Sequence, residues 1–191
     1  MAKTSIVTGA SRAGVGRSAM RETNGRSRRT ARPIGLALAM LLTIWMEGTM
    51  IAAEKDKDIE ASNKRAVQAG FDAWRTGTGG VFDLLAPDAK WTIVGNSPVS
   101  RTFTSRQEFL DVVITPFNAR LSSRLVPTVR GVYADGDMVI ALFDGEGTAR
   151  DGKPYKNTYS WYMQMRDGKI VNVIAFFDTV EFNDFWTRIK P

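Results

Sequence analysis

Two carboxylic acids and one amide are the side chains of this sequence best suited to acid–base chemistry. Glu146, Asn157 and Asp178 lie in the last third of the chain, among runs of β-branched and aromatic residues. A carboxyl group buried beside apolar side chains, or beside a second carboxylate, has a raised pKa and can exchange protons near neutral pH. The three side chains therefore predict proton transfer, provided that the fold brings them together.

Asp-Gly dipeptides at 135–136, 151–152 and 167–168 separate these runs. Because this dipeptide favours two-residue hairpin turns, it predicts an antiparallel meander over residues 122–178. Such turns would pair Asn157 with both Glu146 and Asp178, in one row across three strands. Alternate residues share a face, so the row would lie among apolar and aromatic side chains: Leu142, Tyr155, Tyr159, Trp161, Met163 and Phe176.

Each candidate has a functional and a purely structural interpretation, and both stay open here. Asp178 either exchanges protons or caps a helix that begins at Thr179. Asn157 either contacts a substrate or pairs with neighbouring strands, and Glu146 either joins the site or lies in solvent near a strand end. The Tyr159 hydroxyl could stabilise a developing oxyanion. The aromatic residues that could contact a ligand, or simply form core, are Phe71, Trp74, Trp91, Trp161 and Phe176.

Composition excludes several classes of chemistry. The chain contains no Cys and no His, which excludes disulfides, thiol catalysis, Ser-His-Asp triads and the usual zinc sites. Nothing in the sequence calls for a metal or an organic cofactor. The net charge of +6 arises in residues 1–53, where Lys and Arg outnumber Glu22 and Glu47, so we expect no nucleic-acid binding by the domain that follows.

The N-terminal segment, residues 1–53, is expected to be a basic, flexible extension. Its stretch "SIVTGASRAGVG" resembles the glycine-rich opening of the short-chain dehydrogenases, but Ala13 interrupts the glycine spacing and no βαβ unit follows, so we do not expect a dinucleotide site. The apolar run 34–46 follows basic residues and is typical of an export signal. We therefore expect an exported or membrane-tethered protein. The alternative is translation from Met46 or Met50 and a cytoplasmic protein.

The folded domain is expected over residues 54–191, with helices before the meander. Residues 54–76 have helical apolar spacing, "VFDLLA" predicts a short helix ended by Pro87, and "KWTIVG" predicts a strand. After a loop at 96–104, a capping box at 105–108 begins a helix that buries Phe109, Val112 and Val113 and ends at Pro116. Residues 179–189 predict a closing helix or an extended tail. The fold class is α+β, with a curved antiparallel sheet wrapped around N-terminal helices.

Residues 60–190 resemble the nuclear transport factor 2-like superfamily, in its SnoaL-like and ketosteroid-isomerase-related branch. The segment "DGKPYKNTYSWYMQMRDGKIVNVIAFFDT" carries most of this resemblance. It implies a cone-shaped fold, an acid–base role for Asp178, and a homodimer through the sheet face that carries Thr158, Ser160, Tyr162 and Gln164. The family often adds a histidine near the acidic residue, whereas this chain has none.

Three functions are compatible with these patterns. The first is a cofactor-independent enzyme of isomerase, cyclase or epoxide-hydrolase type that acts on an apolar small molecule. The second is a non-catalytic carrier or sensor of an apolar ligand, and the third is a dimerisation module. The first predicts a carboxyl group of raised pKa inside a closed pocket.

Overall fold

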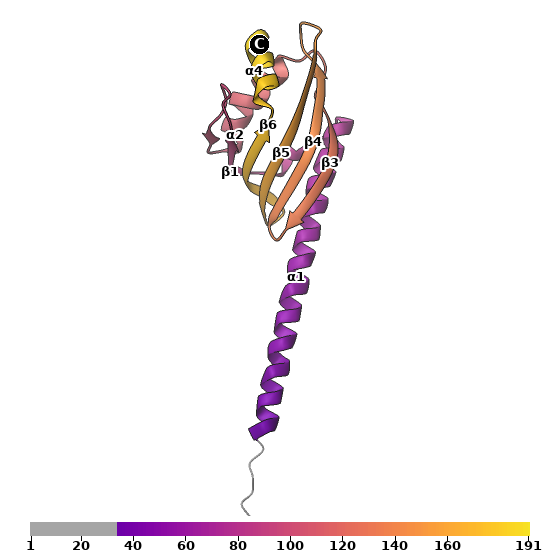
Figure 1. Cartoon of the computed structure of the whole chain (residues 1–191), viewed down its shortest axis with the longest axis vertical. Coiled ribbons are helices and arrows are strands. Elements are labelled where there is room, and N and C mark those ends of the chain that lie inside the picture. Colours follow the sequence, from indigo (N-terminus) through magenta and orange to yellow (C-terminus); the bar gives the residue numbers. More distant parts are fainter. Residues whose placement is uncertain (1–33) are drawn as a thin grey trace, which may run out of the picture. The chain divides into compact units, whose positions relative to one another are not determined.

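The computed structural model describes residues 34–191 (Figure 1). The glycine-rich stretch 5–16 lies outside these residues. The chain divides into two units, Met1–Leu41 and Leu42–Pro191, and the site belongs to the second. The segment predicted as a helix at 54–76 is the C-terminal part of helix α1 (Ile34–Thr76). No helix in the described part of the chain is long and apolar enough to span a membrane.

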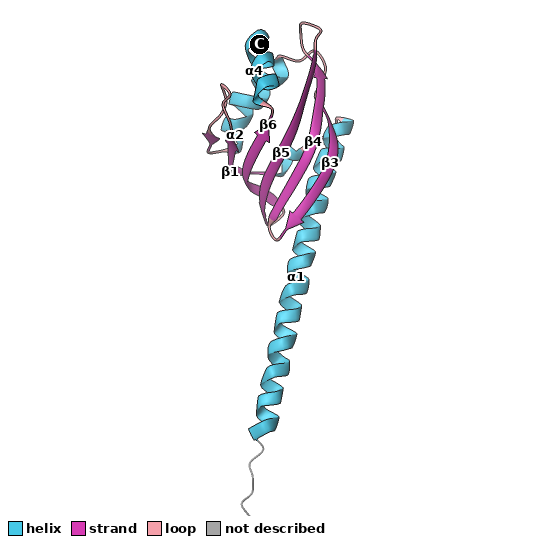
Figure 2. Cartoon of the chain, in the orientation of Figure 1, coloured by secondary structure: helices cyan, strands magenta, loops and turns pink. Residues whose placement is uncertain are grey.

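Six strands form one curved sheet in the order β2-β1-β6-β5-β4-β3 (Figures 1 and 2). The predicted meander is confirmed: four consecutive antiparallel strands run from residue 126 to residue 177. These strands are β3 (Val126–Asp135), β4 (Met138–Thr148), β5 (Pro154–Arg166) and β6 (Lys169–Phe177). Strand β1 (Leu85–Ile93) pairs parallel to β6, and β2 (Thr102–Phe103) pairs antiparallel to β1. The α+β class is therefore as predicted.

Two predicted boundaries near β1 are wrong. The segment "VFDLLA" forms only the short 3₁₀ helix η1 (Val81–Leu84), and β1 begins directly after it and includes Pro87. The segment expected as a loop at 96–104 contains β2. β1 bulges between Leu85 and Lys90 where it pairs with β6, and Pro87 lies in that irregular part.

The helix predicted from Ser105 does begin there, but it does not end at Pro116. The Ser105 hydroxyl accepts a hydrogen bond from the Glu108 N–H at 3.1 Å, which caps α2 (Arg106–Phe109). The π-helical turn η2 (Leu110–Ile114) and helix α3 (Thr115–Ala119) continue it. Pro116 lies in the first turn of α3. Val112, predicted to be buried, is 42% exposed, since the wider π turn rotates the later residues around the axis.

Aromatic side chains line the space between the inner face of the sheet and the helices. Phe71 of α1 lies 4.7 Å from Phe143 of β4, ring centroid to ring centroid. Helix α4 (Thr179–Arg188) closes the chain as predicted and buries Phe182 and Phe185. Phe185 contacts Tyr155 of β5, with the centroids 4.4 Å apart. The core therefore continues from α1 across the sheet to α4.

The strand register differs from the predicted one at both critical hairpins. Thr148 pairs with Pro154, so a five-residue loop, residues 149–153, replaces the expected two-residue turn. Asn157 therefore pairs with Gly145, and Glu146 pairs with Lys156. The turn at Asp167-Gly168 has positive φ at both residues, as predicted, but an irregularity between Gln164 and Met165 then shifts the pairing by one residue. A one-residue shift moves a side chain to the other face of the sheet.

Candidate functional site

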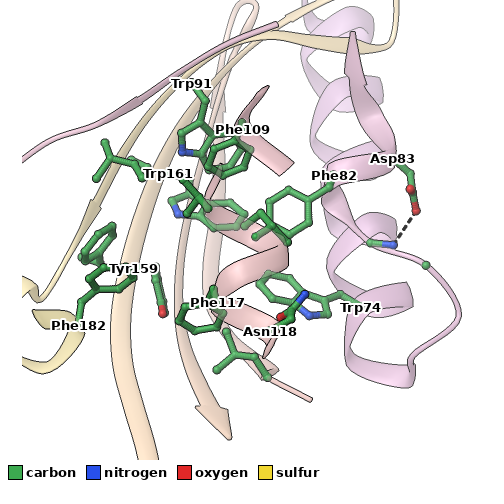
Figure 3. A pocket seen from close by; sticks show the side chains of 18 residues that line it. Trp74, Phe82, Asp83, Trp91, Phe109, Phe117, Asn118, Tyr159, Trp161 and Phe182 are labelled. Carbon is green, nitrogen blue, oxygen red and sulfur yellow. Dashed lines mark hydrogen bonds between the residues drawn. The ribbon is translucent and has the colours of Figure 1, made fainter. Parts of the chain in front are cut away.

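An apolar cavity of about 360 Å³ lies between the inner face of the sheet, η1 and the α2–α3 helix (Figure 3). Its wall is formed mainly by aromatic and aliphatic side chains. Trp91 of β1 stacks on Phe109 of α2 with ring centroids 4.1 Å apart, and Trp161 of β5 meets Trp91 edge to face at 4.9 Å. Trp74 of α1 lies parallel to Trp161 at 6.0 Å. A flat apolar molecule would find aromatic surfaces on several sides.

The structure places three of the five predicted ligand-contacting residues on this wall: Trp74, Trp91 and Trp161. Phe71 lies in the core beside them, 5.9 Å from Trp161, and is not part of the wall. The prediction for Phe176 is wrong. Its side chain is 43% exposed and contacts Tyr162 on the outer face of the sheet, because the register shift puts Phe177 on the inner side instead.

Few polar side chains reach the cavity. Among its wall residues, Tyr159, Asn118 and Asp83 carry polar groups other than indole nitrogen. Tyr159 lies on one side with Phe182, and Asp83 lies on the opposite side beyond Trp74 (Figure 3). The Asp83 carboxylate accepts a hydrogen bond from the Gly80 N–H at 2.9 Å and faces the Arg106 guanidinium at 3.7 Å. Its side chain is 67% exposed, so it lies at the rim rather than inside.

The Tyr159 hydroxyl belongs to a buried chain of hydrogen bonds. It lies 2.8 Å from the Tyr155 hydroxyl, which accepts from Asn157 Nδ2 at 3.1 Å. Burial raises the pKa of Tyr155 to about 12 and raises the pKa of Tyr159 well above 10. Desolvation disfavours the phenolate, so both hydroxyls stay protonated at neutral pH. Tyr159 can donate a hydrogen bond in the cavity but does not act as a base there.

The three residues expected to form the acid–base row are brought together, but not in the apolar cavity. Glu146, Asn157 and Asp178 border a separate polar hollow of about 330 Å³ that also includes Arg130 and Asp144. The Glu146 side chain is 57% exposed and pairs with Lys156 at 3.1 Å. The expectation that it shares the apolar face is wrong, because the longer hairpin loop turns it to the outside.

Asp178 takes the structural role that the sequence left open. Its carboxylate accepts a hydrogen bond from the Val180 N–H at 2.9 Å and caps α4. The side chain of Asn157 bonds the backbone of Asp178 rather than its carboxylate: Oδ1 accepts from the N–H and Nδ2 donates to the carbonyl, each at 2.9 Å. Neither carboxyl group of the predicted row lines the aromatic cavity.

Sequence reasoning missed part of the cavity wall, including Phe82, Asp83, Phe117 and Asn118. Phe82 and Asp83 lie in the segment "VFDLLA", which the sequence predicts only as a short helix. Phe117 and Asn118 follow the proline expected to end the next helix. The apolar spacing of Phe109 and Val113 was the available signal, since it continues to Phe117 at helical intervals.

Comparison with known proteins supports the same fold. Bal32a, from a soil-derived mobile gene cassette, is 18% identical with a TM-score of 0.57, covering 67% of this chain and 98% of that chain. TerC, co-crystallized with polyporic acid, is 20% identical with a TM-score of 0.54, covering 66% of this chain and 98% of that chain. A protein from Jannaschia sp. CCS1, provisionally described as a SnoaL-like polyketide cyclase, is 18% identical with a TM-score of 0.52, covering 68% and 94%. A search of curated proteins gave no match.

The family comparison is more specific than these structural likenesses. The model of the SnoaL-like domain matches residues 67–173, which include the last part of α1 and almost all of the sheet. This segment contains Trp74, Trp91, Tyr159 and Trp161 of the cavity wall. The chain therefore belongs to the SnoaL-like domain family.

Proposed function

We propose that this protein binds an apolar, flat small molecule in the aromatic cavity. The observation that carries the proposal is the cavity itself, about 360 Å³ of space walled by aromatic rings. Its volume lies in the range usual for small-molecule sites, which are mostly apolar with a few placed polar groups. Burying roughly 200 Å² of apolar ligand surface contributes about 5 kcal/mol before the costs of association. The TerC structure with polyporic acid supports a ligand role for this fold.

Proton transfer at the cavity rim is a second candidate, and Asp83 is the residue that favours it. Asp83 carries the one carboxylate among the described residues of the cavity wall. Its Oδ1 lies 3.7 Å from the Arg106 guanidinium. A carboxylate held in place by the Gly80 N–H could take a proton from a substrate that protrudes from the cavity. If Asp83 transfers the proton, Asp83→Asn abolishes turnover of a substrate and leaves its binding intact.

The binding proposal can be tested with N-phenyl-1-naphthylamine, a neutral apolar dye whose fluorescence rises in apolar surroundings. We expect saturable binding of one dye per chain. Ala175 of β6 lies on the cavity wall and is 1% exposed, so Ala175→Leu fills part of the space and lowers the affinity at least about tenfold.

Ile174→Leu is the matched control, because Ile174 is the next residue on the same strand and is 38% exposed. It should bind the dye like the wild type. Equal affinity of both variants and the wild type would show that the dye binds elsewhere, and absence of saturable binding would contradict the proposal.

A further inference from the structure

We infer that the cavity selects ligands that carry a hydrogen-bond acceptor, such as an aromatic ketone, and that Asn157 sets this selectivity through Tyr155 and Tyr159. The inference rests on the proposed binding function and names the chemical class of the ligand. It follows from the direction in which each hydrogen bond of the buried chain must run.

The orientation of the Asn157 amide is fixed by the backbone. Its Oδ1 lies 2.9 Å from the Asp178 N–H, which can only donate, and its Nδ2 lies 2.9 Å from the Asp178 carbonyl, which can only accept. A rotated amide would place donor against donor and acceptor against acceptor. Nδ2 therefore also faces Tyr155, and the Tyr155 oxygen receives a hydrogen from it at 3.1 Å.

Tyr155 in turn sets the direction of the last bond. Its hydroxyl has one hydrogen, and its remaining partner in the described structure is the Tyr159 hydroxyl at 2.8 Å. Tyr155 is 2% exposed, so a hydroxyl hydrogen aimed elsewhere would be buried without a partner, at a considerable cost in free energy. Tyr155 therefore donates to Tyr159. The hydrogen of Tyr159 is left for a group in the cavity, whose wall Tyr159 forms.

The indole groups of the cavity wall are donors as well. The described structure leaves two buried side-chain atoms without a partner, Arg106 Nε and Asn183 Oδ1. Within the described residues, the indole nitrogens of Trp91 and Trp161 have no hydrogen-bond partner. Neither nitrogen is one of the two buried unpartnered atoms, so both remain accessible to a ligand. An indole N–H donates and cannot accept. The wall residues that carry acceptor groups, Asp83 and Asn118, are both exposed and lie at the rim.

These directions determine the chemistry of the ligand. Tyr159 and the two indoles offer hydrogens to a ligand oxygen and would oppose a ligand that presents only N–H or O–H groups. The raised pKa of Tyr155, about 12, keeps the chain of hydroxyls uncharged. A neutral carbonyl oxygen on a flat aromatic frame satisfies both the polar groups and the aromatic walls.

The test compares two probes of the same shape, 9-fluorenone and fluorene, which differ in the carbonyl group. Binding of each to the full chain is measured by calorimetry. We expect the wild type to bind fluorenone roughly five- to tenfold more tightly than fluorene, as for one net hydrogen bond. Tyr159→Phe should prefer fluorenone clearly less than the wild type does, because only the indole N–H groups can still donate to the carbonyl. Tyr162→Phe, on the outer face of the same strand, should keep the wild-type ratio.

Asn157→Asp tests the direction of the chain with almost no change in shape. The oxygen that replaces Nδ2 carries at most one hydrogen, which the Asp178 carbonyl takes, so this oxygen accepts from Tyr155. Tyr155 then accepts from Tyr159, and the Tyr159 hydrogen is no longer left for the ligand. We expect the fluorenone preference to fall to that of Tyr159→Phe although Tyr159 is still present. A loss of overall affinity with an unchanged ratio would overturn the role given to Asn157.

A second measurement needs no variant. The infrared carbonyl stretch of fluorenone bound to the wild type should lie below its value in hexane, as expected for a hydrogen-bonded ketone. A stretch at the hexane value, or equal affinity for both probes, overturns the selectivity and leaves the binding function standing. If neither probe nor the naphthylamine dye binds, the binding function itself is wrong, and the inference fails with it.

Discussion

The side-chain amide of Asn157 bonds both backbone polar groups of Asp178, at 2.9 Å each. It thereby continues the pairing between β5 and β6 beyond Tyr159 and Phe177, where the regular ladder between the two strands ends. Asn157 is 5% exposed, and its amide has partners for both of its polar atoms. A residue expected to stand beside a catalytic carboxylate instead anchors the start of α4 and orients the tyrosine pair.

Replacing Asp178 by Ala is expected to lower stability and to leave ligand affinity unchanged. The carboxylate caps α4 through the Val180 N–H, and loss of such a cap costs about 1 kcal/mol of unfolding free energy. Urea unfolding measures the stability, and titration with N-phenyl-1-naphthylamine measures the affinity. Asp178→Asn is the matched control, since Asn also caps helices well. A large loss of affinity at unchanged stability would restore the ligand-site interpretation of Asp178.

Adding a methyl group at Gly145 is expected to disturb the Tyr159 side of the cavity. A Cβ atom there would lie 3.0 Å from Tyr159 Cε2 and 3.1 Å from Leu125 Cδ2, both on wall residues. We expect Gly145→Ala to cost about 1–3 kcal/mol of stability, as for other overpacked sites, and to weaken dye binding.

Gly147→Ala is the control for this variant, because its Cβ would meet the nearest atom, Leu121 Cδ2, at an ordinary 3.4 Å. Thermal unfolding and dye titration of the pair separate the two positions. Equal stability and equal dye affinity of the two variants would mean that Tyr159 and Leu125 move aside easily, and that this side of the cavity is loosely packed.

Stability is expected to fall at alkaline pH because of the tyrosine pair. Burial raises the pKa of Tyr155 to about 12 and that of Tyr159 well above 10, whereas the unfolded chain ionises its phenols near pH 10. The unfolded state therefore loses protons first. The stabilisation is complete below about pH 10 and is lost as the pH rises, at most at about 1.4 kcal/mol per pH unit for each phenol.

Urea unfolding between pH 9 and pH 12 measures this dependence. Tyr155→Phe should show a shallower fall than the wild type above pH 10, because it has one fewer buried phenol to ionise on unfolding. Absorbance at 295 nm reports phenolate formation in the same samples. A fall of equal slope in both proteins would mean that Tyr155 does not contribute.

Residues with strong local patterns were predicted well. The alternation along β5, with Tyr155, Tyr159 and Trp161 inward and Tyr162 outward, follows from the pleat and is confirmed. The capping sequence at Ser105 begins a helix because the hydroxyl and the Glu108 N–H are close along the chain. Such features depend on residues within a few positions of one another, so the sequence alone can indicate them.

The position of the site depends on loop length and strand pairing, which no local sequence pattern contains. A five-residue loop at 149–153 and an irregularity near Gln164 each changed the pairing by one residue, which moved Glu146 and Phe176 to the outer face. The helix continues past Pro116 through η2 and α3, which brings Phe117 to the cavity.

The sequence by itself determined the fold class, the absence of His and Cys chemistry, and the tryptophans that enclose the cavity. Only the tertiary structure decided which polar groups reach that cavity. The reason is physical: whether a side chain is inward or outward in a sheet depends on register, and register is set by loops and by contacts between distant residues such as Asn157 and Asp178. The acid–base row that the sequence predicts does not lie in the aromatic cavity, because the strand pairing differs by one residue.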